Sequence, residues 1–235
     1  MKFWWWLPPK SGNFGDILTP VILDYFGIKY EYDEHNFQAL CVGSIAKRAR
    51  PGTIVLGSGI IGLKDSCCPE ADWRFVRGPI TRNQVISSGG TCPEIYGDPG
   101  LLLPMIFDES KKIYDIGIVP HFTQYEAVKA RYYKHKVINL RTDDVAQTVN
   151  ELTQCRSLIS SSLHGIVVAH AYKIPVARVE FAPAIKGDGT KFLDHYQALN
   201  IDPAISHVKN PKFTTGSIDM SPVVDIFRQL KDQIQ

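Results

Sequence analysis

Leu158-Ile-Ser-Ser-Ser-Leu-His-Gly-Ile-Val-Val-Ala-His-Ala-Tyr-Lys-Ile-Pro-Val-Ala-Arg-Val-Glu180 reads as a strand, a polar turn, a helix and a second strand. An apolar run ends at Ile159, and apolar residues then recur at helical spacing from Leu163 until Pro175. The turn between them consists of Ser160, Ser161 and Ser162. A turn between the carboxyl end of a strand and the amino end of a helix leaves backbone N–H groups at the positive end of the helix dipole. The stretch therefore predicts an α/β unit with a candidate phosphate site.

Two interpretations of this turn are open. In the first, the serine hydroxyls cap the helix and His164 is a surface residue. In the second, the hydroxyls and the backbone amides bind an anion, and His164 reaches the ligand from the first helical turn. Because serine caps are common, the stretch by itself favours the first interpretation.

The composition is that of an ordinary folded protein. The chain has 235 residues, of which 44% are hydrophobic and 21% are charged, and its formal net charge is +2. Such a small net charge predicts no nucleic-acid partner. No apolar run approaches the roughly 20 residues that a membrane-spanning helix requires.

The cysteines do not form a recognisable framework. There are five of them, two are adjacent at Cys67 and Cys68, and no CxxC spacing occurs. Both a regular disulfide pattern and a zinc site are therefore disfavoured. We expect reduced thiols, a cytoplasmic protein and no bound metal.

Strand and helix signals alternate along the whole chain, which predicts an α/β fold with mostly parallel sheets. The alternation restarts at Ile113, so we expect an N-terminal domain at 1–110 and a C-terminal domain at 111–235. An amphipathic terminal helix is expected at 221–234. Packing of this helix back on the N-terminal half is an open alternative.

Glycine and polar residues recur where the predicted strands end, which is where ligands bind in doubly wound sheets. These positions are Asn13-Phe-Gly-Asp16, Gly57-Ser-Gly59, Arg77-Gly-Pro79, Gly97-Asp-Pro99, Pro120-His121 and Ser160 to His164. Each motif alone is also ordinary turn chemistry. The sequence lacks the GxGxxG, GxxxxGK[ST] and GxSxG patterns, which argues against the common dinucleotide, ATP and serine-hydrolase sites.

The residue types at these positions suit anion and proton chemistry. The planar guanidinium of Arg77 or Arg82 matches a carboxylate or a phosphate. His121 and His164 occupy equivalent places in the two C-terminal strand–helix units and titrate near neutral pH. The structural alternatives are a domain-packing contact for Arg77, a salt bridge for Arg82, and a cap or surface position for His121.

Taken in order, these motifs resemble the polysaccharide pyruvyl transferase family. The resemblance rests on Asn13-x-Gly-Asp16, Gly57-Ser-Gly59, Val76-Arg-Gly-Pro79, Tyr96-Gly-Asp-Pro99, Val119-Pro-His121, Ser160-Ser-Ser-Leu-His-Gly165, Ile174-Pro-Val176 and Lys191-Phe-x-Asp194. It covers the chain from about residue 11 to 200. It implies a fold similar to the glycosyltransferase B class, in which two Rossmann-like domains face a cleft.

The resemblance also implies a reaction. The enolpyruvyl group of phosphoenolpyruvate moves onto two hydroxyls of a sugar, which leaves a pyruvate ketal and phosphate, in exopolysaccharide, capsule or cell-wall glycan synthesis. The acceptor is expected to be an oligosaccharide or a lipid-linked saccharide, and the latter implies peripheral contact with the inner membrane. No cofactor and no metal are expected, because cationic side chains can neutralise the leaving phosphate.

For this reaction we expect catalytic roles for His164 and His121 in acid–base chemistry or phosphate contact, Arg77 as the anion clamp, and Asp16 at the acceptor hydroxyl. The expected substrate-binding residues are Asn13, Gly15, Gly57, Ser58, Gly59, Arg82, Asp98, Ser160, Ser161, Ser162, Gly165 and Lys191.

Two other functions stay open at this stage. A nucleotide-sugar-dependent glycosyltransferase of similar fold would use the same cleft and the same helix amino end for phosphate. A non-catalytic phosphate- or sugar-binding protein would bind ligand without releasing phosphate. Histidines and an arginine at the ends of several strands favour an enzyme over a binding protein.

Overall fold

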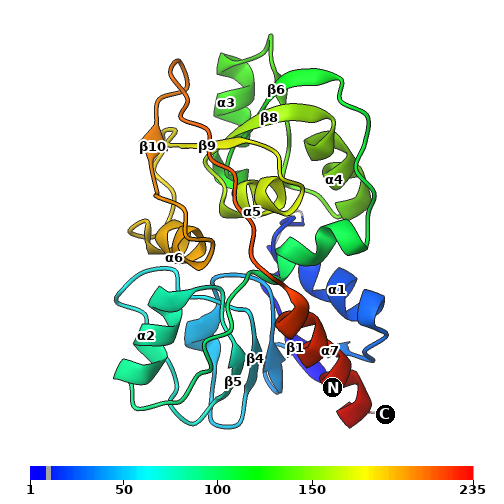
Figure 1. Ribbon diagram of the computed structural model, residues 1–235, viewed down its shortest axis with the longest axis vertical. Helices are drawn as coiled ribbons and strands as arrows, with labels where there is room; N and C mark the ends of the chain where they lie inside the picture. The colour runs from blue at the N-terminus through cyan, green and yellow to red at the C-terminus, as the bar shows by residue number, and fades with distance from the viewer. Residues whose placement is uncertain (9–11, 235) are drawn as a thin grey trace.

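The computed structural model describes residues 1–8 and 12–234, which form two lobes, each built on a parallel sheet (Figure 1). Residues 9–11, part of a loop predicted at 8–12, lie outside the described residues. The first sheet contains β1 (Lys2–Trp4), β2 (Glu31–Tyr32), β3 (Ala39–Leu40), β4 (Ile54–Leu56) and β5 (Asp72–Phe75). The second contains β6 (Tyr114–Val119), β7 (Lys136–Val137), β8 (Cys155–Ser160), β9 (Val176–Val179) and β10 (Ile205–Ser206).

Helices flank both sheets. The α-helices are α1 (Leu18–Phe26), α2 (Pro79–Ser87), α3 (Tyr125–Arg131), α4 (Val145–Thr153), α5 (Leu163–Ala171), α6 (Thr190–Ala198) and α7 (Ser221–Ile234). Short 3₁₀ helices occur at η1 (Ala46–Arg48), η2 (Pro99–Met105) and η3 (Phe122–Gln124). Within the described residues, every pairing between neighbouring strands of the two sheets is parallel, so the predicted α/β class with two Rossmann-like domains is confirmed.

The two sheets share one topology. The strand orders are β2-β1-β3-β4-β5 and β10-β9-β8-β6-β7. Numbered within its own half and read from the β7 edge, the second order repeats the first. In such sheets the strand order reverses beside the first strand, and ligands bind in the crevice at the carboxyl ends there. The reversal points are β1/β3 in one lobe and β6/β8 in the other.

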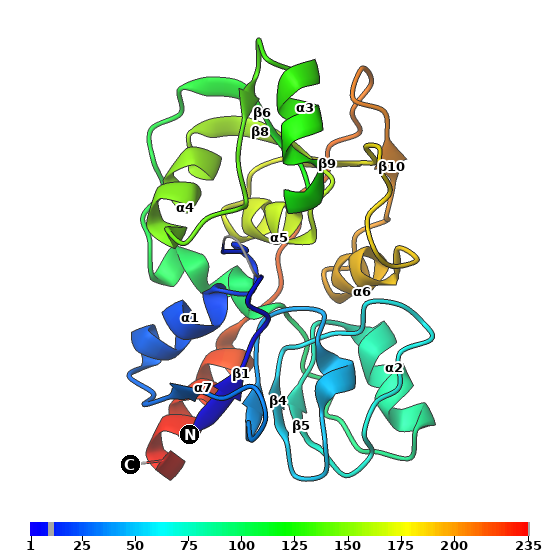
Figure 2. The ribbon, with the colours of Figure 1, turned by 180° about the vertical axis from the view of Figure 1, so that it is seen from behind.

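Both chain termini belong to the lobe of the first sheet. The chain leaves β10, runs between the lobes and ends as α7 beside β1 and α1 (Figures 1 and 2). The ring of Phe227 on α7 stacks on Phe26 of α1, with 4.8 Å between centroids. The bounds of α7 match the helix predicted at 221–234, and the domain limit near residue 110 stays a prediction.

Local sequence accounts for the helix limits. Gly27 ends α1 in a left-handed conformation with φ +65°, which glycine adopts without strain. Pro79 opens α2 in its first turn, where the missing N–H has no cost. Helix α5 is apolar on all sides because it lies between its own sheet, η2 and α4. Its first turn is therefore held rigidly between the lobes.

Some elements have no signal in the sequence. The strands β2 and β10 are edge strands of two residues each. Such short pairings depend on the neighbouring strand and show no period of their own. Among residues 1–8 and 12–234, no helix combines the length and the apolarity needed to cross a bilayer.

Candidate functional site

The loop after β1 meets the first turn of α5 across the lobe interface. A Cβ on Gly15 would lie 1.9 Å from His164 Nδ1, so only glycine permits this approach. On its other side, His164 Nε2 lies 3.8 Å from Asp98 Oδ2, and the side chains are 13% and 0% exposed. Both atoms are buried and have no hydrogen-bond partner within the described part of the chain. A buried polar pair in this state can bind a ligand between or beside its two groups.

Asp16 is a second buried carboxyl beside this pair. Asn13 donates a hydrogen bond to it, which keeps the loop after β1 in place. Burial and, to a smaller extent, the charge of Asp98 raise the pKa of Asp16 to about 7, although Asn13 and Lys191 act in the opposite direction. Asp16 can therefore exchange a proton near neutral pH.

Lys191 brings a cation to the same place from the first turn of α6. Its side chain is only 7% exposed, and burial lowers its pKa to about 8, helped by Arg77 and Arg178 and opposed by Asp16. The ammonium group remains mostly protonated at neutral pH. An anion bound beside it would replace the water lost on burial.

The two histidines differ in their surroundings. Burial lowers the pKa of His121 to about 4, and the positive charges of Lys191 and His164 add to this shift. Burial also lowers the pKa of His164, although Asp98 opposes the change. The ring of His121 accepts a hydrogen bond from the Thr123 N–H at the start of η3, so the predicted cap is present. Both imidazoles are thus neutral at pH 7 and available as bases or hydrogen-bonding groups.

The serine turn contains hydroxyls of different kinds. Ser160 Oγ bonds to the Val119 and Ser162 carbonyl oxygens and accepts from the Ser162 N–H, so it builds the turn. Ser161 Oγ donates to Gln124 Oε1 at 2.7 Å and accepts from the His121 N–H. A Cβ on Gly165 would lie 2.5 Å from Ser160 Oγ, which explains that glycine by packing.

The predicted serine cap is not formed. Ser162 occupies the N-cap position of α5, but no side chain makes a capping hydrogen bond there. The first-turn amides of α5 consequently lack the side-chain acceptor that usually occupies them. This observation favours the anion-binding interpretation of the turn over the capping interpretation.

Arg77 is bonded to protein groups from both lobes. Its side chain is 0% exposed, and its three nitrogens donate to Asp194 Oδ2, Ser44 Oγ and the Ile60 carbonyl oxygen at 2.6–3.1 Å. Asp194 lies on α6, so the arginine joins the first lobe to the helix that carries Lys191. These contacts correspond to the domain-packing alternative, and the anion clamp stays a prediction.

The Gly57-Ser-Gly59 turn supports this ion pair and does not line the site. A Cβ on Gly59 would lie 2.3 Å from the Arg77 guanidinium, and one on Gly57 would overlap Pro99. Ser58 Oγ donates to the Gly43 carbonyl oxygen. Each of the three residues packs against protein, and their predicted substrate contacts stay predictions.

Arg82 is also away from the site. Its guanidinium donates to the Cys92 carbonyl oxygen and lies 3.3 Å from Glu94 Oε1. The arginine holds the loop that follows α2. The salt bridge given as the structural alternative for Arg82 is present, and its predicted substrate contact stays a prediction.

Asp16, Asp98, His164 and Lys191 form what we call the His164 cluster. A cavity of about 730 Å³ adjoins it, between the end of β9, the segment 180–189 and α6. Lys191 and Ser161 line it together with Arg178 and Gln124, which the sequence reasoning missed. The available signal was an arginine inside the apolar strand Val176–Val179, where all four residues are buried. A charged residue at such a position requires a partner.

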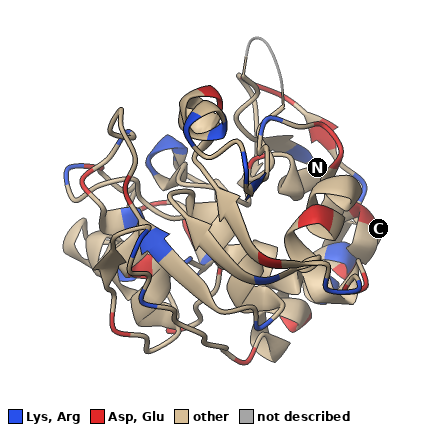
Figure 3. Cartoon of the chain, turned by 90° about the horizontal axis from the view of Figure 1, so that it is seen from above, with Lys and Arg blue, Asp and Glu red and all other residues tan. Residues whose placement is uncertain are grey.

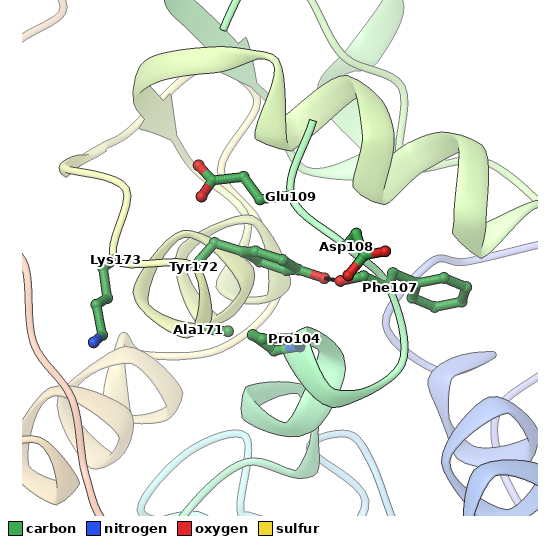
Figure 4. Close-up of a pocket in the computed structure, with 7 residues that line it drawn as sticks. All are labelled: Pro104, Phe107, Asp108, Glu109, Ala171, Tyr172 and Lys173. Carbon is green, nitrogen blue, oxygen red and sulfur yellow. Dashed lines mark hydrogen bonds between the residues drawn. The ribbon is translucent and has the colours of Figure 1, made fainter. Parts of the chain in front are cut away.

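A smaller cavity of about 250 Å³ lies between the end of η2 and the end of α5 (Figure 4). The Tyr172 hydroxyl donates there to the Phe107 carbonyl oxygen at 2.8 Å. None of the predicted site residues line this cavity. We therefore place the site at the larger cavity and the His164 cluster.

No cluster of histidine, cysteine, aspartate and glutamate suited to a metal ion occurs in residues 1–8 and 12–234. All five cysteines are free thiols. Lysine and arginine positions alternate with aspartate and glutamate positions along the ribbon (Figure 3).

Comparison with known proteins gives one family model and two relatives. A family model described as polysaccharide pyruvyl transferase matches residues 8–180. The chain is 28% identical over 222 residues to the succinoglycan biosynthesis protein ExoV of Rhizobium meliloti (strain 1021), covering 86% of this chain and 66% of that protein. It is 32% identical over 171 residues to the uncharacterized protein L143 of Acanthamoeba polyphaga mimivirus, covering 68% of this chain and 60% of that protein. The chain thus spans less than two thirds of the length of either relative.

A solved structure shares the fold. The crystal structure of a functional uncharacterized protein from Klebsiella pneumoniae subsp. pneumoniae matches with a TM-score of 0.50 and 12% identity, over 92% of both chains. The likeness supports the two-lobed α/β architecture alone.

Proposed function

The chain belongs to the polysaccharide pyruvyl transferase family, and we propose that it moves the enolpyruvyl group of phosphoenolpyruvate onto two hydroxyls of a sugar to form a pyruvate ketal. The observation that carries this proposal is the buried pair of His164 Nε2 and Asp98 Oδ2, which has no hydrogen-bond partner among residues 1–8 and 12–234 and lies beside the uncapped first turn of α5. These groups lie near the points where strand order reverses in the two sheets, where ligands of doubly wound folds bind.

The donor carries a phosphate and a carboxylate, and the site offers groups for anions. The uncapped amides at the start of α5 suit a phosphate oxygen, and the helix dipole adds favourable charge. Lys191 supplies a buried ammonium from the facing helix. Arg77 contributes indirectly, because its ion pair with Asp194 positions the helix on which Lys191 lies.

The reaction needs one proton delivered to the methylene carbon of the donor and two removed from acceptor hydroxyls. Asp16, with its pKa near 7, is suited to deliver the first proton. The adjacent carbon then becomes electrophilic, and an acceptor hydroxyl attacks it while neutral His164 takes the hydroxyl proton. The Asp98 carboxylate stabilises the imidazolium that results.

The second half of the reaction releases phosphate. The bond from carbon to the phosphate oxygen breaks, and the proton held on His164 neutralises the leaving group. A second hydroxyl attacks the same carbon and closes the ketal, and its proton returns to Asp16. His121 lies close enough to His164 for that histidine to contribute to the lowered pKa of His121. We assign His121 contact with the phosphate.

The test is incubation of the purified protein with phosphoenolpyruvate and a panel of p-nitrophenyl hexosides. We expect free phosphate together with a product whose mass equals that of the hexoside ketal. Phosphoenolpyruvate should also raise the melting temperature, since it binds only the folded protein. Stabilisation by a UDP- or GDP-sugar, with transfer of its sugar and no phosphate release from phosphoenolpyruvate, would contradict the proposal in favour of a glycosyltransferase.

A further inference from the structure

The cavity beside Lys191 contains a second buried cation. Arg178, at the carboxyl end of β9, is 5% exposed, and its Nε has no hydrogen-bond partner among residues 1–8 and 12–234. The nearest carboxylate oxygen is Glu180 Oε1, 3.7 Å from Nη2, on a side chain that extends into solvent. The guanidinium stacks over the Phe192 ring at 4.1 Å, which fixes its plane without neutralising its charge.

The local charge balance of this cavity is positive. Arg178 and Lys191 both line it from buried positions. Of the acidic residues there, Asp188 accepts from the Leu63 and Thr190 N–H groups and Glu180 is exposed. Buried charges in proteins are paired, because desolvation without a partner is costly. The cavity is therefore built to take an anion.

The backbone beside Arg178 leaves space for this arrangement. Gly189 has φ +91°, and a Cβ placed on it would come within 3.4 Å of Arg178 Nη2. A residue other than glycine would be strained in this backbone conformation. The space beside Nη2 itself would admit a Cβ at ordinary van der Waals distance.

The size and the lining of the cavity indicate what accompanies the anion. A volume of about 730 Å³ suits a ligand of saccharide or nucleotide size, and phosphoenolpyruvate would fill only part of it. Phe181 and Ile185 provide apolar surface, and Ser161 and Lys191 connect the cavity with the His164 cluster. A sugar in the cavity would therefore lie next to the groups assigned to proton transfer.

We propose that this cavity binds the acceptor through a phosphate ester, and that Arg178 is the residue that selects phosphorylated acceptors over neutral ones. The inference rests on the proposed pyruvyl transfer. A nucleoside diphosphate sugar and a simpler sugar phosphate both carry the required group. Arginine suits it because its planar fork donates two hydrogen bonds to phosphate.

The experiment compares Arg178→Gln with the unmodified protein on three acceptors: a p-nitrophenyl hexoside, a hexose 1-phosphate and a UDP-hexose. Arg228→Gln is the matched control, because Arg228 is exposed on α7 and pairs only with Asp225 in the same helix. We expect Arg178→Gln to reduce kcat/KM for the phosphorylated acceptors by about 10- to 100-fold, with KM for phosphoenolpyruvate within about twofold. A greater loss with the UDP-hexose than with the hexose 1-phosphate identifies a diphosphate ester as the ligand.

Two outcomes would overturn the inference. One is an equal loss on neutral and phosphorylated acceptors with a raised KM for phosphoenolpyruvate, which would place Arg178 in the donor site. The other is no change in acceptor preference. If the unmodified protein transfers no pyruvyl group at all, the proposed function fails by itself. Thermal stabilisation by the hexose 1-phosphate then tests whether the cavity at Arg178 binds a phosphate ester. Arg178→Gln should abolish the stabilisation, and Arg228→Gln should not.

Discussion

Two buried ion-pair positions join the lobes, and they differ in how completely their atoms are satisfied. At Arg77 and Asp194, each nitrogen of the guanidinium has an acceptor, and Thr81 donates to both oxygens of the carboxylate. At His164 and Asp98, two facing atoms 3.8 Å apart have no partner in the described residues. The saturated position stabilises the assembly of the lobes, and the unsaturated one is where we propose that a ligand binds.

The number of hydrogen-bond partners of the buried polar atoms separates structural from functional residues within this set of motifs. Both positions lie at strand ends, both are buried, and both connect the same two lobes. Their hydrogen-bond partners distinguish them, because a buried polar group without a partner costs free energy unless a ligand binds it.

Arg77→Met should produce the largest loss of stability. The substitution leaves the Asp194 carboxylate buried without its cation, which costs about 3–5 kcal/mol. Urea unfolding measures the loss. Arg82→Met, five residues later in α2, is the control, because its pair with Glu94 is partly exposed and is worth about 1 kcal/mol or less. Equal losses for the two variants would show that Arg77 is not the saturated structural contact described above.

His164→Gln should act on turnover and leave stability nearly unchanged. Removal of a general base reduces kcat by about 10²- to 10⁴-fold. Stability should change little, because His164 Nε2 makes no hydrogen bond to the described residues. Phosphate release and urea unfolding are the two measurements. His35→Gln is the control, since that histidine is exposed on the first lobe. Unchanged kcat in His164→Gln would remove the histidine from the chemistry.

The place of the site at the carboxyl ends of the strands stays a prediction, and the surroundings of its residues differ in ways that the sequence does not show. Arg77 and His164 look alike in sequence, because both follow a strand and begin a helix. Saturation of Arg77 depends on Ser44, Ile60 and Asp194, and no local pattern predicts that these groups converge. Arg178 was missed because the residues around it in strand β9 are apolar, so the strand is interpreted as core despite its one charged residue.

The fold itself was largely predictable. Hydrophobic periodicity and turn residues located the helices α1, α2 and α7 closely, because the proline, the glycine and the amphipathic pattern that set their limits are local. The edge strands were not predictable, because two paired residues carry no pattern. Nor could the sequence reveal the approach of Gly15 to His164, which joins distant segments.

Asp16→Asn should change the pH dependence of stability. The folded pKa of Asp16 is raised to about 7 from 3.8, so its protonated form stabilises the native state below pH 4 and this contribution is lost as the pH rises to 7. Asparagine cannot ionise and should remove that slope, a difference of about 1–3 kcal/mol between the two ends of the range. Urea unfolding of both proteins at pH 4 and pH 7 measures it. Parallel profiles would mean that Asp16 titrates normally and is no proton donor.

The smallest effects separate two neighbouring serines by the same criterion. Ser160 Oγ accepts from the Ser162 N–H and donates its one proton to the Val119 or the Ser162 carbonyl oxygen, so Ser160→Ala should cost about 1–2 kcal/mol of stability. Ser162 makes no capping bond, so Ser162→Ala should change stability by about 0.5 kcal/mol or less. If Ser162 instead donates to the phosphate, its removal should raise KM for phosphoenolpyruvate several-fold while the unfolding curve stays in place. The reverse result, with Ser162 important for folding and Ser160 dispensable, would mean that the hydroxyl serves as the helix cap after all and that the amides of α5 are not available to an anion.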